Sequence, residues 1–250
     1  MSKVKLLRKA MTNSLPDYVR DGLVLWLDGD ENLMSVKAED GTPVTVWRDR
    51  AINGQQANVG AVVKSLDAMI FDGINSRGRI TDTETVVLSG ILSGLKERTV
   101  EIVCKLDNAD NVQTVFIGAG NTATPEIGAA GLWYRPTSGG FKVGTWDNSP
   151  VVSVQNVTNR ASYSIVYGNS DLSDFNFYQN GNLCTKGGIA GNMYSAVTAI
   201  GARLKTDGTT WQYRLSGEIC CIRVYNRKLT DAERGRNLEI DRRRFDIDAG

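Results

Sequence analysis

Histidine is absent from the 250-residue sequence. This side chain is the commonest general base near neutral pH and the commonest metal ligand in proteins. Its absence excludes Ser-His-Asp triads, Cys-His dyads and every zinc site that contains histidine. The sequence therefore points away from most hydrolytic mechanisms before any motif is considered.

Cysteine is scarce, and its spacing indicates no disulfide or metal framework. The four residues are Cys104, Cys184, Cys220 and Cys221. No C-x-x-C pair is present, and adjacent cysteines do not readily form an ordinary disulfide. Cys104 shares a strand face with Val100, Ile102 and Leu106, which predicts a small core side chain rather than a ligand. We expect reduced cysteines and folding in a reducing compartment.

Long hydrophobic runs are also missing. No segment approaches the length of a transmembrane helix. The N-terminal MSKVKLLRKAMTNS is basic but has no apolar stretch of signal-peptide length. The formal net charge of +1 provides no global field that would attract nucleic acid or a membrane surface. We therefore expect neither a nucleic-acid partner nor a membrane partner.

The features that the sequence does contain indicate short strands joined by tight turns. The chain contains 26 glycines, and no linker or low-complexity segment divides it. Period-2 alternation is clearest from Thr99 to Leu106, and Asn180-Gly181 is a strong signal for a type I′ hairpin. Many strands without helix periodicity predict an all-β, two-sheet antiparallel jelly-roll sandwich.

The segment from Gly217 to Phe245 closes this arrangement. Its apolar run ICCIRVY predicts a central strand covered on both faces. Thr230-x-x-Glu233 then forms a capping box, which predicts a short C-terminal helix over 231–244 with Leu238 and Phe245 as anchors. Arginines and acids alternate along this helix, so we expect a solvated, salt-bridged face.

Residues 1–21 stand apart from the jelly-roll domain, which we expect to span 22–250. The segment is basic and weakly apolar, and Pro16 ends any helix within it. One interpretation is a loose tether, and the other is an assembly arm that docks on a partner subunit. If the segment is an assembly arm, its deletion is expected to leave the melting temperature of the domain nearly unchanged but to abolish incorporation into the assembly.

Several motifs occur in the order typical of one family. They are GLVLWLDG from Gly22, Trp47-Arg48-Asp49, Phe71-Asp72-Gly73-Ile74-Asn75-Ser76, Thr99-Val100-Glu101-Ile102, Phe177-Tyr178-Gln179-Asn180-Gly181 and the closing G-x-I-x-x-I-R-V-Y-N-R-x-L-T-x-x-E. Together they resemble the laminin-G-like, concanavalin A-like lectin/glucanase jelly rolls over residues 22 to 245. The resemblance implies the fold but says little about function, because this fold carries lectins, hydrolases, adhesive modules and virion proteins.

A second resemblance concerns the setting. The pattern GLVLWLDG…W-x-D…VYNRxLT…RF is similar to jelly rolls attached to bacteriophage particles. It implies a virion protein, synthesised in the host cytoplasm, that acts in capsid decoration, as a head fibre or as a tail fibre. Other virion proteins would be its partners through the N-terminal arm, and we expect a homo-oligomer.

Catalysis is not expected. Glucan-cleaving relatives of this family carry an E-x-D-x-E strand, and retaining glycosidases need two carboxyl groups about 5 Å apart. The sequence has no such strand: Glu101 stands alone among apolar residues, and Glu239 and Asp241 diverge on the closing helix. We expect a non-catalytic binding or structural module. The alternatives are a cellular lectin or adhesin and a polysaccharide-active hydrolase with an atypical site.

Two sets of candidate site residues follow. Aromatic side chains at strand ends can stack on sugar rings of a cell-surface polysaccharide, and the candidates are Trp133, Tyr134, Trp146 and Trp211. Many relatives hold a structural calcium with loop oxygens, for which Asp28, Asp30 and Asp72 are the candidates. Cys220 and Cys221 stand where many relatives have hard carboxylate oxygens, which argues against a conventional calcium site. No other cofactor is expected.

Overall fold

The computed structural model describes eleven stretches of the chain: residues 16–30, 41–51, 56–81, 97–118, 130–136, 140–143, 151–153, 156–168, 175–187, 197–204 and 209–247. These stretches form seventeen strands and one helix. The first nine strands are β1 (Leu23–Asp28), β2 (Pro43–Arg48), β3 (Gln56–Ser65), β4 (Ala68–Asp72), β5 (Arg77–Thr81), β6 (Arg98–Leu106), β7 (Gln113–Gly118), β8 (Ala130–Arg135) and β9 (Gly140–Val143). The remaining elements are β10 (Val151–Ser153), β11 (Ala161–Tyr167), β12 (Phe175–Gln179), β13 (Asn182–Gly187), β14 (Val197–Ile200), β15 (Arg203–Leu204), β16 (Trp211–Gln212), β17 (Ser216–Tyr225) and the helix α3 (Asp231–Phe245).

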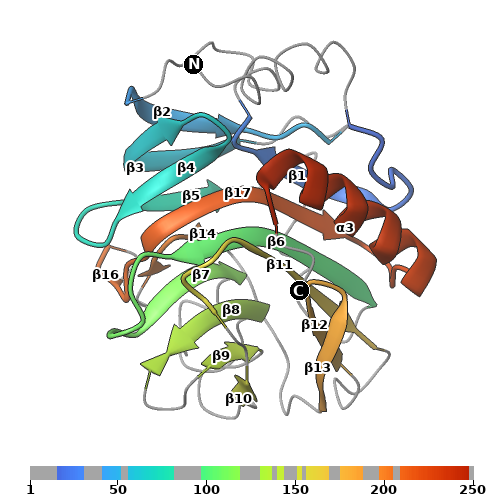
Figure 1. Cartoon of the computed structure of the whole chain (residues 1–250). Coiled ribbons are helices and arrows are strands. Elements are labelled where there is room, and N and C mark those ends of the chain that lie inside the picture. Colours follow the sequence, from blue (N-terminus) through green and yellow to red (C-terminus); the bar gives the residue numbers. More distant parts are fainter. Residues whose placement is uncertain are drawn as a thin grey trace.

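The strands form one curved antiparallel sheet around a large apolar core (Figure 1). Its order is β10-β9-β8-β7-β14-β5-β3-β4-β17-β6-β11-β12-β13, while β1 pairs with β17 and β2 with β3. The two ends of this order approach each other at β10 and β13, so the sheet folds over onto itself. The predicted jelly roll is thus confirmed, with its two layers hydrogen-bonded into one continuous sheet. The strands β15 and β16 form a separate hairpin.

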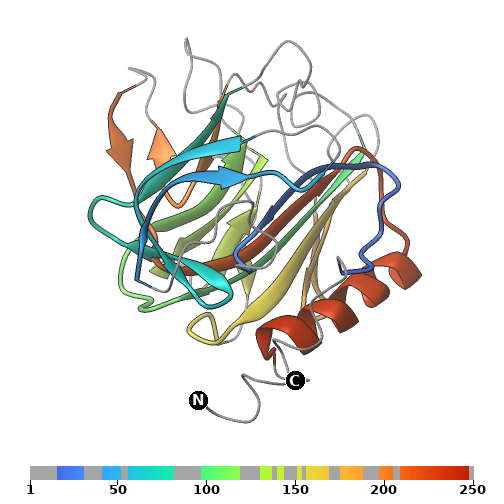
Figure 2. The same ribbon diagram turned by 90° about the horizontal axis from the view of Figure 1, so that it is seen from above.

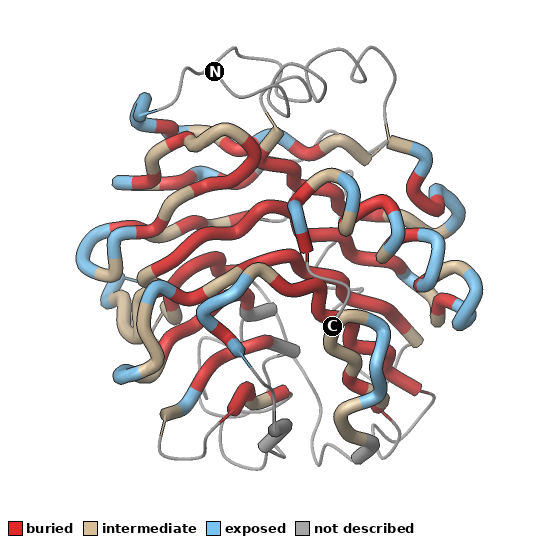
Figure 3. The backbone as a smooth tube through the Cα atoms, viewed as in Figure 1, coloured by how far each residue is buried: buried red, intermediate tan, exposed pale blue. Residues whose placement is uncertain are grey.

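Strand β17 is covered on both faces, as its apolar sequence predicts (Figure 3). Ile222 and Val224 face the main core, and a β-bulge between Ile219 and Cys221 interrupts the pairing with β6. Cys220 and Cys221 both contribute to a second apolar cluster under α3. All four cysteines are free thiols in the structure.

Helix α3 packs on the outer side of the curved sheet (Figure 2). It begins after Thr230, whose side chain accepts a hydrogen bond from the backbone of Glu233, while the Glu233 carboxylate accepts one from the backbone of Thr230. The predicted capping box is therefore confirmed. The helix ends at Phe245, one residue later than expected, and Asp246 follows in a left-handed conformation with φ of 60°. No helix in the described part of the chain is long and apolar enough to cross a membrane.

The face of α3 that meets the sheet differs from the expected one. Arg234 and Asp241 are buried, together with Asn237, Ile240 and Phe245. The expectation of a solvated charged face was wrong for Arg234 and Asp241. On the outer face of the sheet, Asp241 pairs with Arg223 of β17, and Arg234 lies against the Tyr178 ring of β12. Phe245 is confirmed as an anchor, whereas Leu238 is only partly buried.

The packed part of the chain begins before residue 22. Tyr18 and Val19 are 1% and 7% exposed, and the Tyr18 hydroxyl donates to Asp241 at 2.7 Å. The Val19 amide donates to the Asn237 side chain at 3.0 Å. A domain boundary between residues 21 and 22 therefore cuts through packed structure. Residues 1–15, the rest of the expected arm, lie outside the described residues.

Candidate functional site

A row of polar side chains crosses the outer face of the sheet beneath α3. In strand register, Arg223 of β17 lies opposite Glu101 of β6, Glu101 opposite Ser164 of β11, and Ser164 opposite Tyr178 of β12. Residues opposite each other in paired strands point to the same face. Strand register thus places these four side chains side by side although they come from four distant segments.

Arg223 is the central cation of this row and is 1% exposed. Its Nη1 and Nη2 donate to the two oxygens of Asp241 at 2.8 and 2.6 Å, and its Nε donates to Oε2 of Glu101 at 3.0 Å. The Tyr18 ring lies 4.0 Å from its guanidinium carbon. All the donors of a buried guanidinium need partners, so these contacts make Arg223 a structural cation rather than a ligand-binding one.

Glu101 lines the pocket, and both of its hydrogen bonds in the described structure fall on one carboxylate oxygen. Its Oε2 accepts from Arg223 and also from the Asn237 amide at 2.8 Å, whereas neither bond involves Oε1. Burial raises the pKa of Glu101, Arg223 lowers it and Asp241 raises it, and the net shift is upward. Two buried carboxylates thus share one guanidinium, and Glu101 is the one nearer the pocket.

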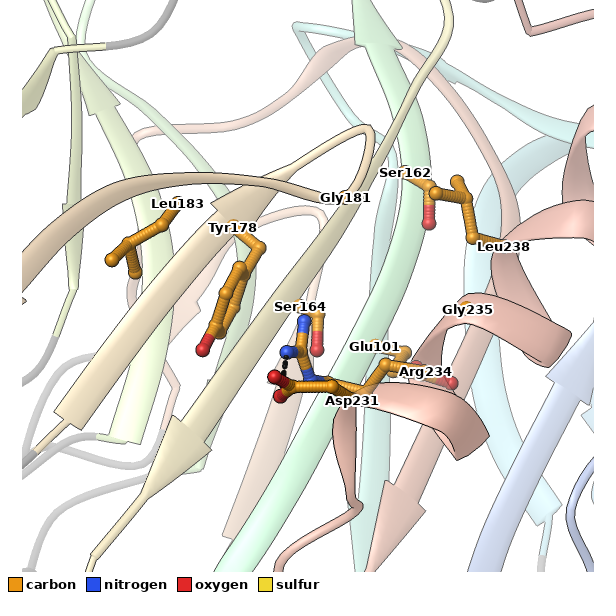
Figure 4. Close-up of a pocket in the computed structure, with 10 residues that line it drawn as sticks. All are labelled: Glu101, Ser162, Ser164, Tyr178, Gly181, Leu183, Asp231, Arg234, Gly235 and Leu238. Atoms are coloured by element: carbon orange, nitrogen blue, oxygen red, sulfur yellow. Dashed lines mark hydrogen bonds and ion pairs between the residues drawn. The ribbon is translucent and has the colours of Figure 1, made fainter.

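A pocket of about 210 Å³ opens between α3 and the hairpin formed by β12 and β13 (Figure 4). Its lining residues come from β6, β11, the hairpin and the first two turns of α3: Glu101, Ser162, Ser164, Tyr178, Gly181, Leu183, Asp231, Arg234, Gly235 and Leu238. Asn180 and Gly181 form the hairpin turn, with φ of 51° and 87°, as the type I′ prediction requires. The turn touches α3, where Arg242 donates to the Asn180 carbonyl at 3.3 Å.

Two buried polar groups on the wall of this pocket lack partners. The hydroxyl of Ser164 and the Nε of Arg234 have no hydrogen bond within the described part of the protein. The two residues are only 8% and 7% exposed. Leaving a buried donor or acceptor unpaired typically costs about 1–3 kcal/mol. An ordered water or a ligand in the pocket can complete the hydrogen bonding of such groups.

The orientation of Arg234 is fixed by its other contacts. Its Nη2 donates to Asp231 at 2.6 Å, and its guanidinium carbon lies 3.5 Å from the centre of the Tyr178 ring. Figure 4 shows the guanidinium linked to Asp231 by a dashed line, close to Ser164 and on the side of the pocket that Tyr178 also lines. The pocket therefore presents a fixed cation, a carboxylate oxygen and a hydroxyl within a space the size of a small polar molecule.

The three aromatic candidates that lie in the described residues do not form one exposed surface. Trp133 and Tyr134 are 1% and 6% exposed, so the expectation that a sugar stacks on them was wrong: both lie on β8 with their side chains buried. Trp211 is partly exposed, and Arg77 lies 5.7 Å above its ring. Trp146 lies outside the described residues. A sugar-binding role for Trp211 stays a prediction.

The calcium candidates are occupied by protein groups. Asp28 is 2% exposed, and Arg244 donates to both its oxygens at 2.8 Å. Burial by itself raises the pKa of Asp28, but Arg244 and the hydrogen bonds outweigh it and hold that pKa below its ordinary value. Asp30 approaches the same guanidinium at 3.4 Å. The Arg244 guanidinium therefore occupies the position beside Asp28 and Asp30 that a calcium ion would need.

Asp72, the third candidate, stabilises a turn. Its Oδ1 accepts from the backbone amides of Ile74, Asn75 and Ser76 at 2.8–2.9 Å. These bonds lower the pKa of Asp72 to about 2, although burial acts in the opposite direction. Among the described residues, no group of three or more Asp, Glu, Cys or His side chains is placed to hold a metal ion. Asp72 is thus a turn former.

Sequence reasoning missed the residues of the pocket. Glu101 was interpreted as an isolated acid, and Arg234 as part of a solvated helix face. The available signal was a polar residue within three largely apolar strand segments: Arg223 in ICCIRVY, Glu101 in TVEIVCKL and Ser164 in SYSIVY. Alternation alone does not show that these residues are opposite one another, because strand register depends on bulges and turns.

Comparison with known families and structures extends these observations. Residues 81–233 match the laminin G family described as the concanavalin A-like lectin/glucanases superfamily. No protein of curated function matches the chain at a significant level.

Solved structures share the fold at low sequence identity. A Trypanosoma rangeli sialidase in complex with sialic acid aligns with a TM-score of 0.62 and 13% identity, over 87% of this chain and 32% of that one. The receptor binding domain of a botulinum neurotoxin C/D mosaic serotype aligns with a TM-score of 0.61 and 13% identity, over 88% of this chain and 52% of that one. The chain therefore spans about a third to a half of the structures it resembles, and the likeness concerns the fold alone.

Proposed function

The chain belongs to the concanavalin A-like lectin/glucanase superfamily, and on that premise we propose that it is a non-catalytic module that binds carbohydrate in the pocket between α3 and the β12–β13 hairpin. The single observation that carries this proposal is a pair of buried polar groups on pocket-lining residues, Ser164 Oγ and Arg234 Nε, which have no hydrogen-bond partner within the described part of the chain. Sugars present many hydroxyls that donate and accept at once, so they suit a wall with mixed polar groups.

The charge of the pocket supports a polar ligand rather than an apolar one. Asp231 pairs with Arg234, while Oε1 of Glu101, which takes part in neither of that residue's hydrogen bonds in the described structure, offers an acceptor. The volume of about 210 Å³ is below the roughly 300–1,000 Å³ of pockets for drug-sized ligands. One monosaccharide unit matches this size, with the remainder of a glycan outside.

Binding without cleavage is part of the proposal. Glycoside hydrolysis uses two carboxyl groups that both face the scissile bond. Of the two acids in the pocket, Glu101 is held by Arg223 and Asn237, and Asp231 is paired with Arg234. Purified protein incubated with laminarin, mixed-linkage glucan and bacterial capsular polysaccharide is expected to release no reducing ends above a blank. Turnover that disappears when Glu101 or Asp231 is neutralised would overturn this part.

The experiment for binding uses a variant that fills the pocket without damaging the helix. Gly235 lines the pocket, and a Cβ at this position meets nothing within 4 Å. Gly235→Phe therefore places a ring at the pocket while removing a glycine from a helix interior, where glycine is unfavourable by about 1 kcal/mol. On a glycan array, the wild-type chain should bind and Gly235→Phe should lose at least tenfold in affinity.

The matched control is Ala232→Phe, which adds the same ring at an exposed position of α3 that does not line the pocket. It should bind like the wild type. If both variants bind equally well, the pocket is not the carbohydrate site. Loss of binding in Trp211→Ala, with Gly235→Phe unaffected, would move the site to the β15–β16 hairpin.

The biological setting proposed here is a bacteriophage virion, where the module serves capsid decoration, a head fibre or a tail fibre. This part rests on the motif pattern of the sequence. One small pocket gives weak binding, and repeated display as a homo-oligomer on a particle raises avidity by orders of magnitude. Mass spectrometry of purified phage particles tests it: the chain should copurify with capsid proteins, and its presence only in a cell-envelope fraction would favour the cellular lectin.

A further inference from the structure

Three features of the pocket lining together suit a ligand that carries more than hydroxyl groups. They are a buried donor, a carboxylate acceptor and an exposed apolar edge. The donor is Arg234 Nε, the acceptor is Glu101 Oε1, and the edge is Leu183, which is 46% exposed on β13. Leu183 is one of two large hydrophobic side chains in the described structure that are exposed to this degree.

Arg234 Nε sets the first requirement on the ligand. The guanidinium stays protonated at every relevant pH, so its N–H groups only donate. Nη2 is used by Asp231, while Nε is buried without a hydrogen-bond partner in the described structure. Because the residue is 7% exposed, bulk water does not satisfy this group freely. The ligand must therefore bring an acceptor such as a carbonyl oxygen.

Glu101 sets the second requirement. Arg223 and Asn237 both bind Oε2, so Oε1 is the oxygen available to a ligand. An ionised carboxylate accepts hydrogen bonds and does not donate. The ligand must therefore bring an N–H or O–H donor close to its acceptor, and the Ser164 hydroxyl next to Glu101 in the strand register can serve either.

The apolar edge sets the third requirement. Leu183 and Leu238 line the pocket together with the polar groups. Leu238 also lies against the hairpin turn, since a Cβ on Gly181 would come within 2.8 Å of its Cδ2. A small apolar group of the ligand, one methyl in size, would remove part of this surface from water.

We propose that the pocket recognises the acetamido group of a 2-acetamido-2-deoxyhexose, a proposal that rests on the carbohydrate-binding function above. The carbonyl oxygen accepts from Arg234 Nε and Ser164, the N–H donates to Glu101 Oε1, and the methyl contacts Leu183. A free amino sugar fits less well, because its ammonium group accepts nothing from Arg234 and places a second cation beside it. A plain hexose has hydroxyls for Arg234 and Glu101 but lacks the methyl.

The test compares three probes by calorimetry or ligand-observed NMR: N-acetylglucosamine, glucose and glucosamine. N-acetylglucosamine should bind the wild-type chain at least tenfold more tightly than the other two. Ser164→Ala and Arg234→Met should each reduce that affinity tenfold or more, and Leu183→Ser about threefold. The control Arg236→Met removes an exposed arginine of the same helix and should leave all three affinities unchanged.

The outcomes separate this inference from the proposed function. If glucose or glucosamine binds as tightly as N-acetylglucosamine, the acetamido proposal fails and carbohydrate binding stands. If none of the three sugars binds and the glycan array is also blank, both fail. Arg234→Met is scored only if its melting temperature stays within a few degrees of the wild type. If Arg234→Met is too unstable to score, Ser164→Ala provides the test, because it deletes only one hydroxyl. Unchanged affinity of Ser164→Ala for N-acetylglucosamine overturns the proposal.

Discussion

Arg223 and Asp241 form a bidentate ion pair between the last strand and the closing helix. The two N–O distances are 2.8 and 2.6 Å, and the side chains are 1% and 0% exposed. Because Glu101 binds the same guanidinium, this pair holds one wall of the pocket in place. The ion pair therefore connects the stability of the fold to the geometry of the proposed site.

Neutralising Asp241 should be strongly destabilising. Removal of one partner of a buried ion pair leaves an uncompensated charge, which typically costs about 3–5 kcal/mol. We expect Asp241→Asn to lower the free energy of unfolding by an amount in this range in urea titrations. The control Arg236→Ala, on the exposed side of the same helix, should stay within about 0.5 kcal/mol of the wild type. An equally small effect of Asp241→Asn would show that the pair is not formed.

The segment around Tyr18 should contribute to stability. The Tyr18 hydroxyl donates to Asp241 at 2.7 Å and accepts from Arg244 at 2.9 Å. Hydrogen bonds to charged groups typically contribute about 1.5–3 kcal/mol. Tyr18→Phe should therefore lower the free energy of unfolding by roughly this much, and deletion of residues 1–21 should lower the melting temperature further. This reverses the expectation from sequence that the deletion leaves the melting temperature nearly unchanged, and an unchanged melting temperature after the deletion would restore it.

The capping box at the start of α3 should have a measurable effect. Thr230 Oγ1 accepts from the Glu233 amide at 3.3 Å, and Glu233 Oε2 accepts from the Thr230 amide at 2.8 Å. Thr230→Ala should lower the free energy of unfolding by about 1 kcal/mol, the typical cost of a lost N-cap. Thr230→Ser keeps the hydroxyl and should lie close to the wild type. Identical urea midpoints for Thr230→Ala and the wild type would contradict the cap.

The stability of the fold should fall in acid, because two carboxyl groups with lowered pKa values become protonated. The amides of residues 74–76 lower the pKa of Asp72 to about 2, and Arg227 with Thr230 lowers that of Glu233 to about 2. A carboxyl group with a lowered pKa in the folded state stabilises the protein fully above its unfolded pKa. That contribution is lost as the pH falls through the folded pKa, so the loss should occur between about pH 4 and pH 2. Asp72→Asn should flatten this part of the curve of melting temperature against pH, and an unchanged slope would contradict the assignment.

The fold was largely predictable because its signals are local. Alternating strands, the Asn180-Gly181 turn and the Thr230 capping box each depend on neighbours in sequence, and the structure contains all three. The family motifs also have a physical role. For example, Asp49 of the W-x-D motif accepts from the backbone amides of Trp26 and Ala51.

The pocket was not predictable, because it depends on register across four strands and on the face that α3 turns inward. Charged residues on a short helix usually face solvent, yet Asp241 pairs with Arg223 of β17 and Arg234 lies against the Tyr178 ring of β12. Strand-end aromatics were expected to be exposed, but Trp133 lies within strand β8 and is only 1% exposed. These errors share one cause: which face an element buries is decided by tertiary packing and not by the sequence pattern alone.

The most direct test of the account is a crystal structure of the protein soaked separately with glucose and with N-acetylglucosamine. The account predicts density for a sugar between α3 and the β12–β13 hairpin in at least one soak. Its polar atoms should lie within hydrogen-bond distance, about 2.7–3.2 Å, of Ser164 Oγ and Arg234 Nε. Water alone in this pocket in both soaks, or a sugar bound only beside Trp211, would contradict it.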